Sequence, residues 1–202
     1  MLVLELIGTV AFAISGAFVA IERKMDILGV IVLGLTTAIG GGFIRDLVIG
    51  QVPPVMFRNP VYAAVAVLTS LIVFIPAVRQ FLSRHKHFDR LLLVMDSIGL
   101  GIFTAVGISA AFRLQSGFVL TLFVGVITGV GGGLMRDVFA GVLPSIFVRH
   151  FYACASMLGA LSGYFCQRIF ANETLSLTVC VILTFILRIF AAHFRWSLPK
   201  AE

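Results

Sequence analysis

The feature that most constrains this chain is an internal repeat with a period of 91 residues. Without a gap, this shift gives 16 identical positions in the 60 columns from residue 5 to residue 64. It places Gly40-Gly41-Gly42 on Gly131-Gly132-Gly133 and Arg45-Asp46 on Arg136-Asp137. Most matched residues are Gly, Pro, Arg or Asp rather than interchangeable aliphatic residues, so chance is a poor explanation. The chain is therefore expected to contain one structural unit twice.

Both copies are too apolar for a water-soluble fold. Hydrophobic residues make up 60% of the 202 residues and charged residues only 12%, whereas soluble domains have about 45–50% and about 25%. A membrane-spanning helix needs roughly 20 mostly apolar residues. The apolar runs predict an all-α integral membrane protein, a single membrane domain over residues 1–202, with seven transmembrane helices. The predicted spans are residues 2–21, 27–50, 61–78, 91–112, 118–141, 150–167 and 175–194.

The predicted spans divide into two units of three helices and one additional helix. Residues 1–79 form the first repeat, residues 80–90 a basic linker, and residues 91–170 the second repeat. The seventh helix, at residues 175–194, lies outside the repeat. Because three is odd, the second copy enters the bilayer from the opposite face, so the repeats are inverted. Sites in such proteins tend to lie at the repeat interface, near the bilayer midplane.

Lysine and arginine fall mainly in alternate loops, which predicts the orientation in the membrane. Short cytoplasmic loops carry the excess of basic residues. One side has Arg58, Arg113 and Arg168. The other side has Arg23, Lys24, Arg79, Arg84, Lys86, Arg90, Arg149, Arg195 and Lys200. We therefore expect a protein of the inner (plasma) membrane, with its N-terminus outside and its C-terminus in the cytoplasm. This topology also accounts for the basic linker without any lipid-regulatory role.

Three consecutive glycines lie within the second span and again within the fifth. A glycine costs about 1 kcal/mol relative to alanine in a helix, so Gly40 to Gly42 and Gly131 to Gly133 predict kinked, interrupted helices. The alternative is that these small residues only let neighbouring helices approach closely. A phosphate-binding loop is excluded, because no strand precedes either triplet and no Gly-Lys-Ser/Thr follows it.

Each triplet is followed by an arginine and an aspartate at membrane depth. A charged side chain there costs at least about 2.5 kcal/mol and needs a partner or a wet cavity. Arg45 and Asp46 point about 100° apart on a helix, so we do not expect these neighbours to pair with each other. The same holds for Arg136 and Asp137.

Depth in the membrane suggests other partners for the two arginines. Each span rises about 1.5 Å per residue from its predicted end, which places Glu5 at the depth of Arg45 and Asp96 at the depth of Arg136. We expect the ion pairs Arg45–Glu5 and Arg136–Asp96, one in each repeat. The alternative function for these charges is a buried network that only holds the helices together.

The remaining polar residues support weaker predictions. Thr36, Thr37 and Thr128 precede the glycines and are candidate pore hydroxyls, although threonines in membrane helices more often bond their own backbone. Arg188, near the end of the seventh span, is expected to extend its charge to the membrane surface.

Several classes of function find no support in the sequence. The histidines lack metal-ligand spacing, and neither a serine–histidine–acid arrangement nor a catalytic pair of carboxylates is present. We predict no enzyme activity, no cofactor and no metal site. The basic residues behind the net charge of +6 stand at the ends of apolar runs, so nucleic acid is not expected as a partner either. The predicted partners are membrane lipids and a transported solute.

The doubled Gly-Gly-Gly-x-x-Arg-Asp motif on two three-helix repeats, followed by a seventh helix, resembles the prokaryotic TRIC (trimeric intracellular cation) channels. The resemblance covers nearly the whole chain. It implies a homotrimer in which each protomer has its own pore, permeable to potassium and other monovalent cations. It also implies that the spans carrying Gly40 to Gly42 and Gly131 to Gly133 are kinked beside the pore. Bacterial proteins with the same repeat have also been described as glycine transporters.

Three functions are therefore open from the sequence. The first is a passive potassium-permeable channel, with Arg45, Asp46, Arg136 and Asp137 along its path. The second is a secondary carrier of a small zwitterion such as glycine, whose carboxylate an arginine would bind. The third is a non-transporting structural protein. A bare arginine repels potassium, so a channel requires each arginine to be neutralised by a carboxylate or to move aside.

Overall fold

The structure is a computed structural model that describes residues 1–78, 88–148 and 151–196. Regular structure within these residues is helical. Most of the predicted basic linker at residues 80–90 lies outside the described residues, as do Arg149 and Lys200.

The long helices fall where the apolar runs predict them, with ends shifted by a few residues. Two short helices follow α2 and α7, and the sequence analysis did not anticipate either. In chain order the helices are α1 (Leu2–Glu22), α2 (Ile27–Val48), α3 (Val55–Arg58), α4 (Val61–Phe74), α6 (Phe88–Arg113), α7 (Phe118–Phe139), α8 (Ser145–Val148), α9 (Tyr152–Phe170) and α10 (Glu173–His193).

Five helices in the described part of the chain are long and apolar enough to cross a membrane: α1, α2, α6, α7 and α10. The described helix α4 has 14 residues, fewer than a span requires. Helix α9 has 19 residues but includes Gln167 and Arg168 near its end. The protein is thus an all-helical membrane protein, and the predicted count of seven spans stays a prediction.

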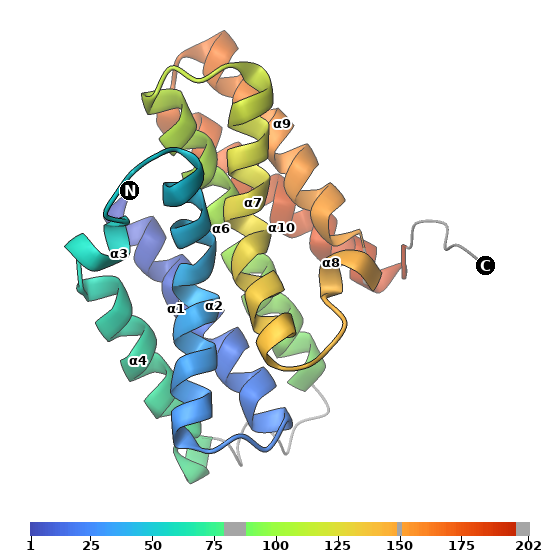
Figure 1. Ribbon diagram of the computed structural model, residues 1–202. Helices are drawn as coiled ribbons and strands as arrows, with labels where there is room; N and C mark the ends of the chain where they lie inside the picture. Colours follow the sequence, from blue (N-terminus) through green and yellow to red (C-terminus); the bar gives the residue numbers. More distant parts are fainter. Residues whose placement is uncertain (79–87, 149–150, 197–202) are drawn as a thin grey trace.

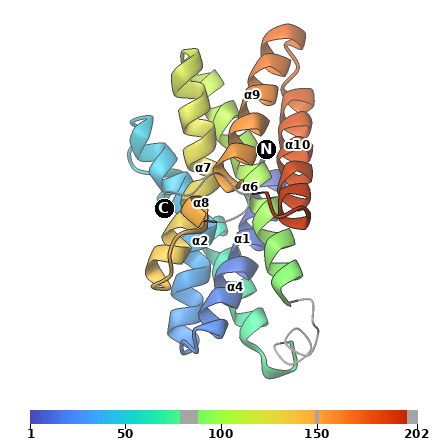
Figure 2. The same cartoon turned by 90° about the vertical axis from the view of Figure 1, so that its right-hand side faces the viewer.

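The helices alternate in direction between two ends of the bundle (Figure 1). We name these ends after the residues where α1 begins and finishes: the Glu5 end and the Glu22 end. Helix α2 lies beside α7 at the centre; α4 packs against α1 and α2, and α10 packs against α6 and α9. Figure 2, turned by 90°, shows α9 and α10 together on the side away from α4. Repeat-related helices therefore meet in the middle, and α10 covers only the second half.

The central contact is the crossing of α2 and α7, where both glycine triplets lie. A Cβ atom added to Gly41 would stand 2.1 Å from the carbonyl oxygen of Thr128. A Cβ atom added to Gly132 would stand 2.2 Å from the carbonyl oxygen of Thr37. Gly41 and Gly132 are 91 residues apart, as are Thr37 and Thr128, so the crossing brings equivalent residues of the two copies together. Only glycine at both positions permits this approach of the two backbones.

The glycines do not interrupt their helices, so that part of the expectation is wrong, while the predicted kinks at the triplets stay a prediction. Helix α2 continues from Ile27 to Val48 and α7 from Phe118 to Phe139, through both triplets. Close helix packing, the alternative stated above, describes the contact. The physical reason is that backbone groups at membrane depth have no water to bond and must stay paired within the helix, while the packing of α2 on α7 offsets the cost of the glycines.

A second small-residue contact occurs once in each half. In the first, a Cβ atom on Gly16 would meet the Thr37 hydroxyl at 2.5 Å and the Leu33 carbonyl oxygen at 2.6 Å. In the second, a Cβ atom on Gly107 would meet the Thr128 hydroxyl at 2.7 Å. Helices α1 and α6 therefore pack against α2 and α7 in the same way.

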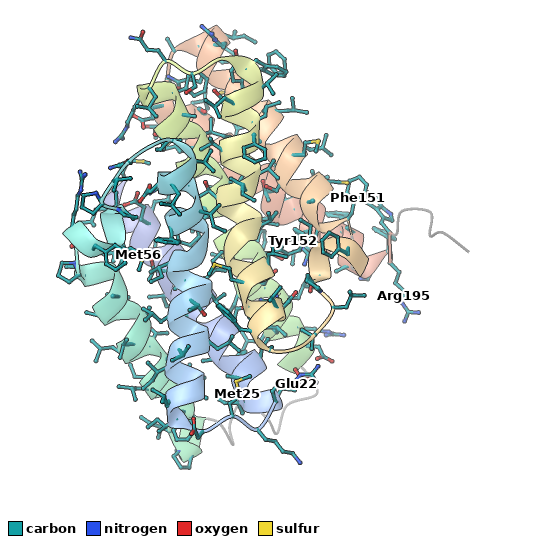
Figure 3. All side chains as sticks on the ribbon, in the orientation of Figure 1. Glu22, Met25, Met56, Phe151, Tyr152 and Arg195 are labelled. Atoms are coloured by element: carbon teal, nitrogen blue, oxygen red, sulfur yellow. The ribbon has the colours of Figure 1, made fainter. Side chains whose placement is uncertain are left out.

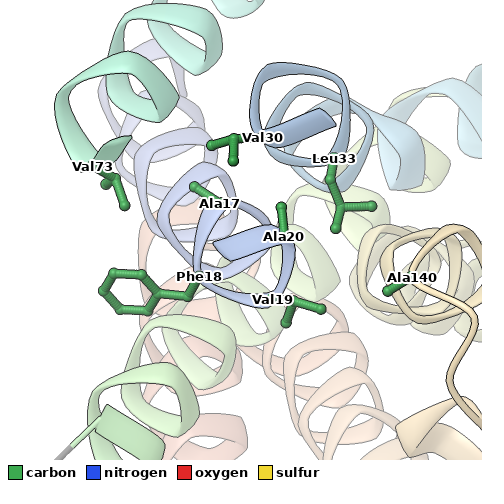
Figure 4. Close-up of a cluster of buried hydrophobic side chains, with 8 residues drawn as sticks. All are labelled: Ala17, Phe18, Val19, Ala20, Val30, Leu33, Val73 and Ala140. Atoms are coloured by element: carbon green, nitrogen blue, oxygen red, sulfur yellow. The ribbon is translucent and has the colours of Figure 1, made fainter. Parts of the chain in front are cut away.

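Aliphatic and aromatic side chains fill the space between the helices near the Glu22 end. Figure 4 shows one such cluster, in which side chains of α1, α2 and α4 meet Ala140, just after α7. Many large apolar side chains point outward instead, among them Val119 and Phe147, which are 77% and 71% exposed. Figure 3 shows that side chains project from all around the bundle, and exposed apolar side chains are expected on a surface in contact with lipid tails.

We predict that Gly41→Ala and Gly132→Ala destabilise the protein, because each methyl group would collide with a backbone oxygen that cannot rotate away. Overpacking of this kind costs about 1–3 kcal/mol, and each kcal/mol lowers the melting temperature by about 2–4 °C in a chain of this size. Thermal unfolding of the purified protein in detergent measures the loss.

Gly42→Ala is the matched control from the same triplet. Its Cβ atom would come no closer than 3.8 Å, to the flexible Arg45 side chain, and alanine favours the helix. This variant should melt at or above the wild-type temperature. Equal melting of the Gly41 and Gly42 variants would contradict the close crossing.

Candidate functional site

The last turn of α2 holds a buried ion pair between adjacent residues. The Arg45 Nε atom donates to Asp46 Oδ1 at 2.8 Å, and Arg45 Nη2 lies 2.7 Å from the same oxygen. Asp46 Oδ2 accepts from the backbone N–H of Val55 at 2.8 Å, at the start of α3. The expectation that these neighbours do not pair is wrong, because the long arginine side chain folds back along the helix far enough to span the roughly 100° between them.

The same arrangement occurs at the end of α7. The Arg136 Nε atom donates to Asp137 Oδ1 at 2.8 Å, and Arg136 Nη2 lies 2.8 Å from it. Asp137 Oδ2 accepts from the backbone N–H of Ser145 at 2.7 Å, where α8 begins. In each motif, one carboxylate oxygen of the aspartate pairs with the arginine. The other oxygen accepts a hydrogen bond from the backbone N–H at the start of a short helix.

Arg136 also makes the predicted ion pair with the preceding helix. Its Nη1 atom lies 2.6 Å from Asp96 Oδ1 on α6 and donates to the hydroxyl of Ser15 on α1. Arg136 and Asp96 are each only 4% exposed. The predicted pair Arg136–Asp96 is therefore confirmed, and Ser15 joins it from the other repeat.

The predicted pair Arg45–Glu5 is wrong. Among the described residues, Glu5 has no ion pair, and its Oε2 atom instead accepts a hydrogen bond from the hydroxyl of Tyr62 on α4. Arg45 pairs instead with Asp46 on its own helix. The sequence carried no signal for Tyr62, because a tyrosine near the end of a span is most often an interfacial residue.

Arg188 lies inside the protein rather than reaching to the surface as predicted. It is 4% exposed, its Nη2 atom is 3.8 Å from Asp96 Oδ2, and its guanidinium stacks 4.6 Å from the centre of the Tyr152 ring. The expectation was wrong because Arg188 lies on the side of α10 that faces α6 and α9, where it contacts Asp96 and the Tyr152 ring. Arg188 is therefore a candidate functional residue beside Asp96, whereas its position near the end of an apolar run predicts a surface location.

The three candidate threonines donate to their own helix. The Thr37 and Thr128 hydroxyls bond the carbonyl oxygens of Leu33 and Val124, each at 2.5 Å, and Thr36 bonds Val32 at 2.8 Å. Thr37 and Thr128 are fully buried at the α2–α7 crossing. A role as pore hydroxyls stays a prediction.

Two cavities approach the arginines from opposite ends of the bundle. At the Glu5 end, a cavity with space for about 490 Å³ of water is lined by Glu5, Arg45 and Arg113, among others. At the Glu22 end, a cavity of about 260 Å³ is lined by Arg90, Asp96, Arg136 and Arg188, among others. Each cavity therefore reaches the arginine of one motif.

The region between the cavities is closed by packed side chains. Phe12 on α1 and Phe103 on α6, which are 91 residues apart, stack with their ring centres 5.2 Å apart. Both are buried, and each fits against a glycine of the other helix: Phe103 against Gly8 and Phe12 against Gly99. Along α1 and α6, this stack lies between the two arginine sites.

Known proteins share both the repeat and the fold. A family profile described as "Glycine transporter" matches residues 2–77 and again residues 93–168. The inner membrane protein YadS of Escherichia coli K12 is 36% identical, over 97% of this chain and 93% of its own. A solved TRIC cation channel is 40% identical with a TM-score of 0.88, over 99% of this chain and 96% of its own. The chain belongs to the prokaryotic TRIC family.

A TRIC orthologue from Rhodobacter sphaeroides, described as a trimeric intracellular cation channel, is 31% identical with a TM-score of 0.88. The alignment covers 96% of this TRIC family member and 98% of the orthologue. Because the matches run over both complete chains, the helices that carry Arg45 and Arg136 lie within the shared fold.

We predict that Asp96→Asn destabilises the protein much more than Glu5→Gln. The amide at position 96 would leave two buried guanidinium groups short of a carboxylate, and breaking a buried ion pair from one side costs about 3–5 kcal/mol. Glu5 lines a cavity with space for water and, within the described part of the chain, its carboxylate bonds a tyrosine, so the amide there should cost about 1 kcal/mol. Thermal unfolding of both variants in detergent provides the comparison, and similar losses would contradict the asymmetry between the two ends.

Proposed function

We propose that this protein is a monovalent cation channel, permeable to potassium, with a pore inside each protomer of a homotrimer. The observation that carries the proposal is the pair of cavities with space for water, one at each end of the bundle, each of which reaches the arginine of one Arg–Asp motif. The likeness to TRIC cation channels over the whole chain supports the same function.

In the proposed pathway, aspartates offset the positive charges of the two arginines, which would otherwise repel a cation. Asp46 neutralises Arg45, and Asp96 with Asp137 neutralises Arg136, at distances of 2.6–2.8 Å. Each arginine therefore presents a compensated charge to a passing cation instead of a bare one. At an effective dielectric constant near 20, a bare unit charge at 4 Å would repel a cation by roughly 4 kcal/mol.

The conformation described here is closed at the centre. Conduction requires Phe12 and Phe103 to separate and α2 to move against α7. We propose that the helices bend at their glycine triplets in this step, because neither triplet has side chains that lock the crossing. In the orientation set by the basic loops, the Glu5 end faces outward and the Glu22 end faces the cytoplasm, with seven helices crossing the membrane.

A second candidate is a secondary carrier of glycine. The description of the family profile favours it, and an arginine in each cavity offers a partner for a carboxylate. A carrier would bind the amino acid at one arginine at a time and release it at the opposite end.

We predict discrete potassium currents from the purified protein in planar bilayers under a potassium gradient. Arg136→Ala and Asp137→Ala should each change the single-channel conductance or the open probability severalfold, because each removes one charge of a compensated pair. Arg168→Ala is the control: this arginine lies on the outside of α9 beside Tyr164 and should leave the current unchanged.

A silent bilayer combined with concentrative glycine uptake into liposomes would replace the channel proposal with the carrier. Currents that respond equally to the Arg136 and Arg168 variants would remove the second motif from the pathway.

A further inference from the structure

The charged residues that form the two Arg–Asp sites are equivalent except at one position. Glu5, Arg45 and Asp46 form the first cluster, and their formal charges sum to −1. Asp96 and Arg136-Asp137 form the second cluster with the same sum, each residue lying 91 positions after its counterpart. The second cluster gains Arg188 from α10, which is not part of the repeat. With Arg188 included, the charges of the second cluster sum to zero.

We propose that Arg188 is a tethered cation, which neutralises the second cluster and occupies the place beside Asp96 that a mobile monovalent cation takes when Arg188 moves away. This inference deepens the proposed function, since it makes Asp96 a binding position for the permeating ion. Arg188 is thereby a positioning residue, whose displacement admits the ion.

Asp96 contacts two arginine side chains, one at short distance and one at longer distance. Arg136 approaches Asp96 to 2.6 Å, whereas Arg188 stands 3.8 Å from the other carboxylate oxygen. Charge-assisted hydrogen bonds have lengths of about 2.7–2.9 Å, so the Arg188 contact is an ion pair without a direct hydrogen bond to Asp96. Of the two contacts that Asp96 makes with guanidinium groups, the one with Arg188 is the longer and the weaker.

The surroundings supply a route for the ion and a second contact for the Arg188 charge. Asp96, Arg136 and Arg188 all line the cavity of about 260 Å³ at the Glu22 end, so a hydrated ion reaches the carboxylate without crossing packed side chains. The Tyr152 ring, 4.6 Å from the Arg188 guanidinium, is a cation–π surface on which the charge stays favourable.

Ion-dependent thermal stability tests the inference without requiring any current. Arg188→Gln leaves the second cluster with a charge of −1, and a bound potassium ion then stabilises the folded protein by mass action. We predict that this variant melts several degrees higher in potassium chloride than in choline chloride at equal ionic strength. Wild type and the control Arg168→Gln, which both keep the Glu5-end cluster at a charge of −1, set the baseline and should agree with each other within about 1 °C in their response to the two salts. An equal salt response of Arg188→Gln and wild type would overturn the proposal.

The double variant Asp96→Asn/Arg188→Gln provides the second arm. It leaves Arg136 with Asp137, a neutral pair, and should return to the salt response of the wild type. If Arg188→Gln alone does not fold, the double variant is expected to fold, because the charge that Arg188 balances has gone. Failure of both variants, or a potassium preference retained in the double variant, would overturn the role assigned to Arg188.

Bilayer recording separates this inference from the proposed function. In a channel, Arg188→Gln should reach half-maximal current at a potassium concentration severalfold below that of wild type. Potassium-specific stabilisation of Arg188→Gln without any current from either protein would support the ion position and reject the channel. Currents from both proteins with identical concentration dependence and no potassium-specific stabilisation would keep the channel and reject the tethered cation.

Discussion

The close approach of two backbones at the α2–α7 crossing is the constraint on which the rest of the structure depends. Gly41 and Gly132 each face a carbonyl oxygen of the partner helix where any Cβ atom would collide. Arg45 and Arg136 follow these glycines by four residues, about one helical turn, so the crossing fixes the position of both charged motifs. Because α2 and α7 run in opposite directions, one arginine is directed to each end of the bundle (Figure 1). The contact between α2 and α7 thus fixes the positions of both Arg–Asp motifs.

The aspartate of each motif makes it possible to bury an arginine there. A buried charge needs a partner and satisfied hydrogen bonds, and each aspartate supplies the partner from the adjacent position in the sequence. Its second oxygen binds the first N–H of a short helix, Val55 of α3 or Ser145 of α8. The charged motif and the turn after the long helix are therefore one unit, and movement of the arginine would be transmitted to the connection that follows it.

The sequence predicted the elements and their repetition well, because long apolar runs and a 91-residue period are properties of the chain itself. It predicted Arg136–Asp96 from depth, since both side chains face the centre of the bundle. The same argument failed for Arg45–Glu5, because depth says nothing about the direction of a side chain around its helix, nor about Tyr62 from a third helix. The adjacent Arg–Asp pairs were missed because an angle between Cβ directions ignores the reach of a long side chain. The interrupted helices were wrong because intrinsic propensity does not include packing or the absence of water.

The non-repeated helix distinguishes the two ends of the protein. Two inverted copies of one unit would present identical ends to the two sides of a membrane, with identical charges on both arginine sites. Helix α10 packs against α6 and α9 but not against their counterparts α1 and α4, among the contacts of the described residues. It thereby adds Arg188 to the Asp96 site while Glu5 keeps only its tyrosine. A difference in charge between the two ends must come from residues outside the repeat or from positions where the copies differ. Arg188 is a buried charge of the first kind, and it lies beside Asp96.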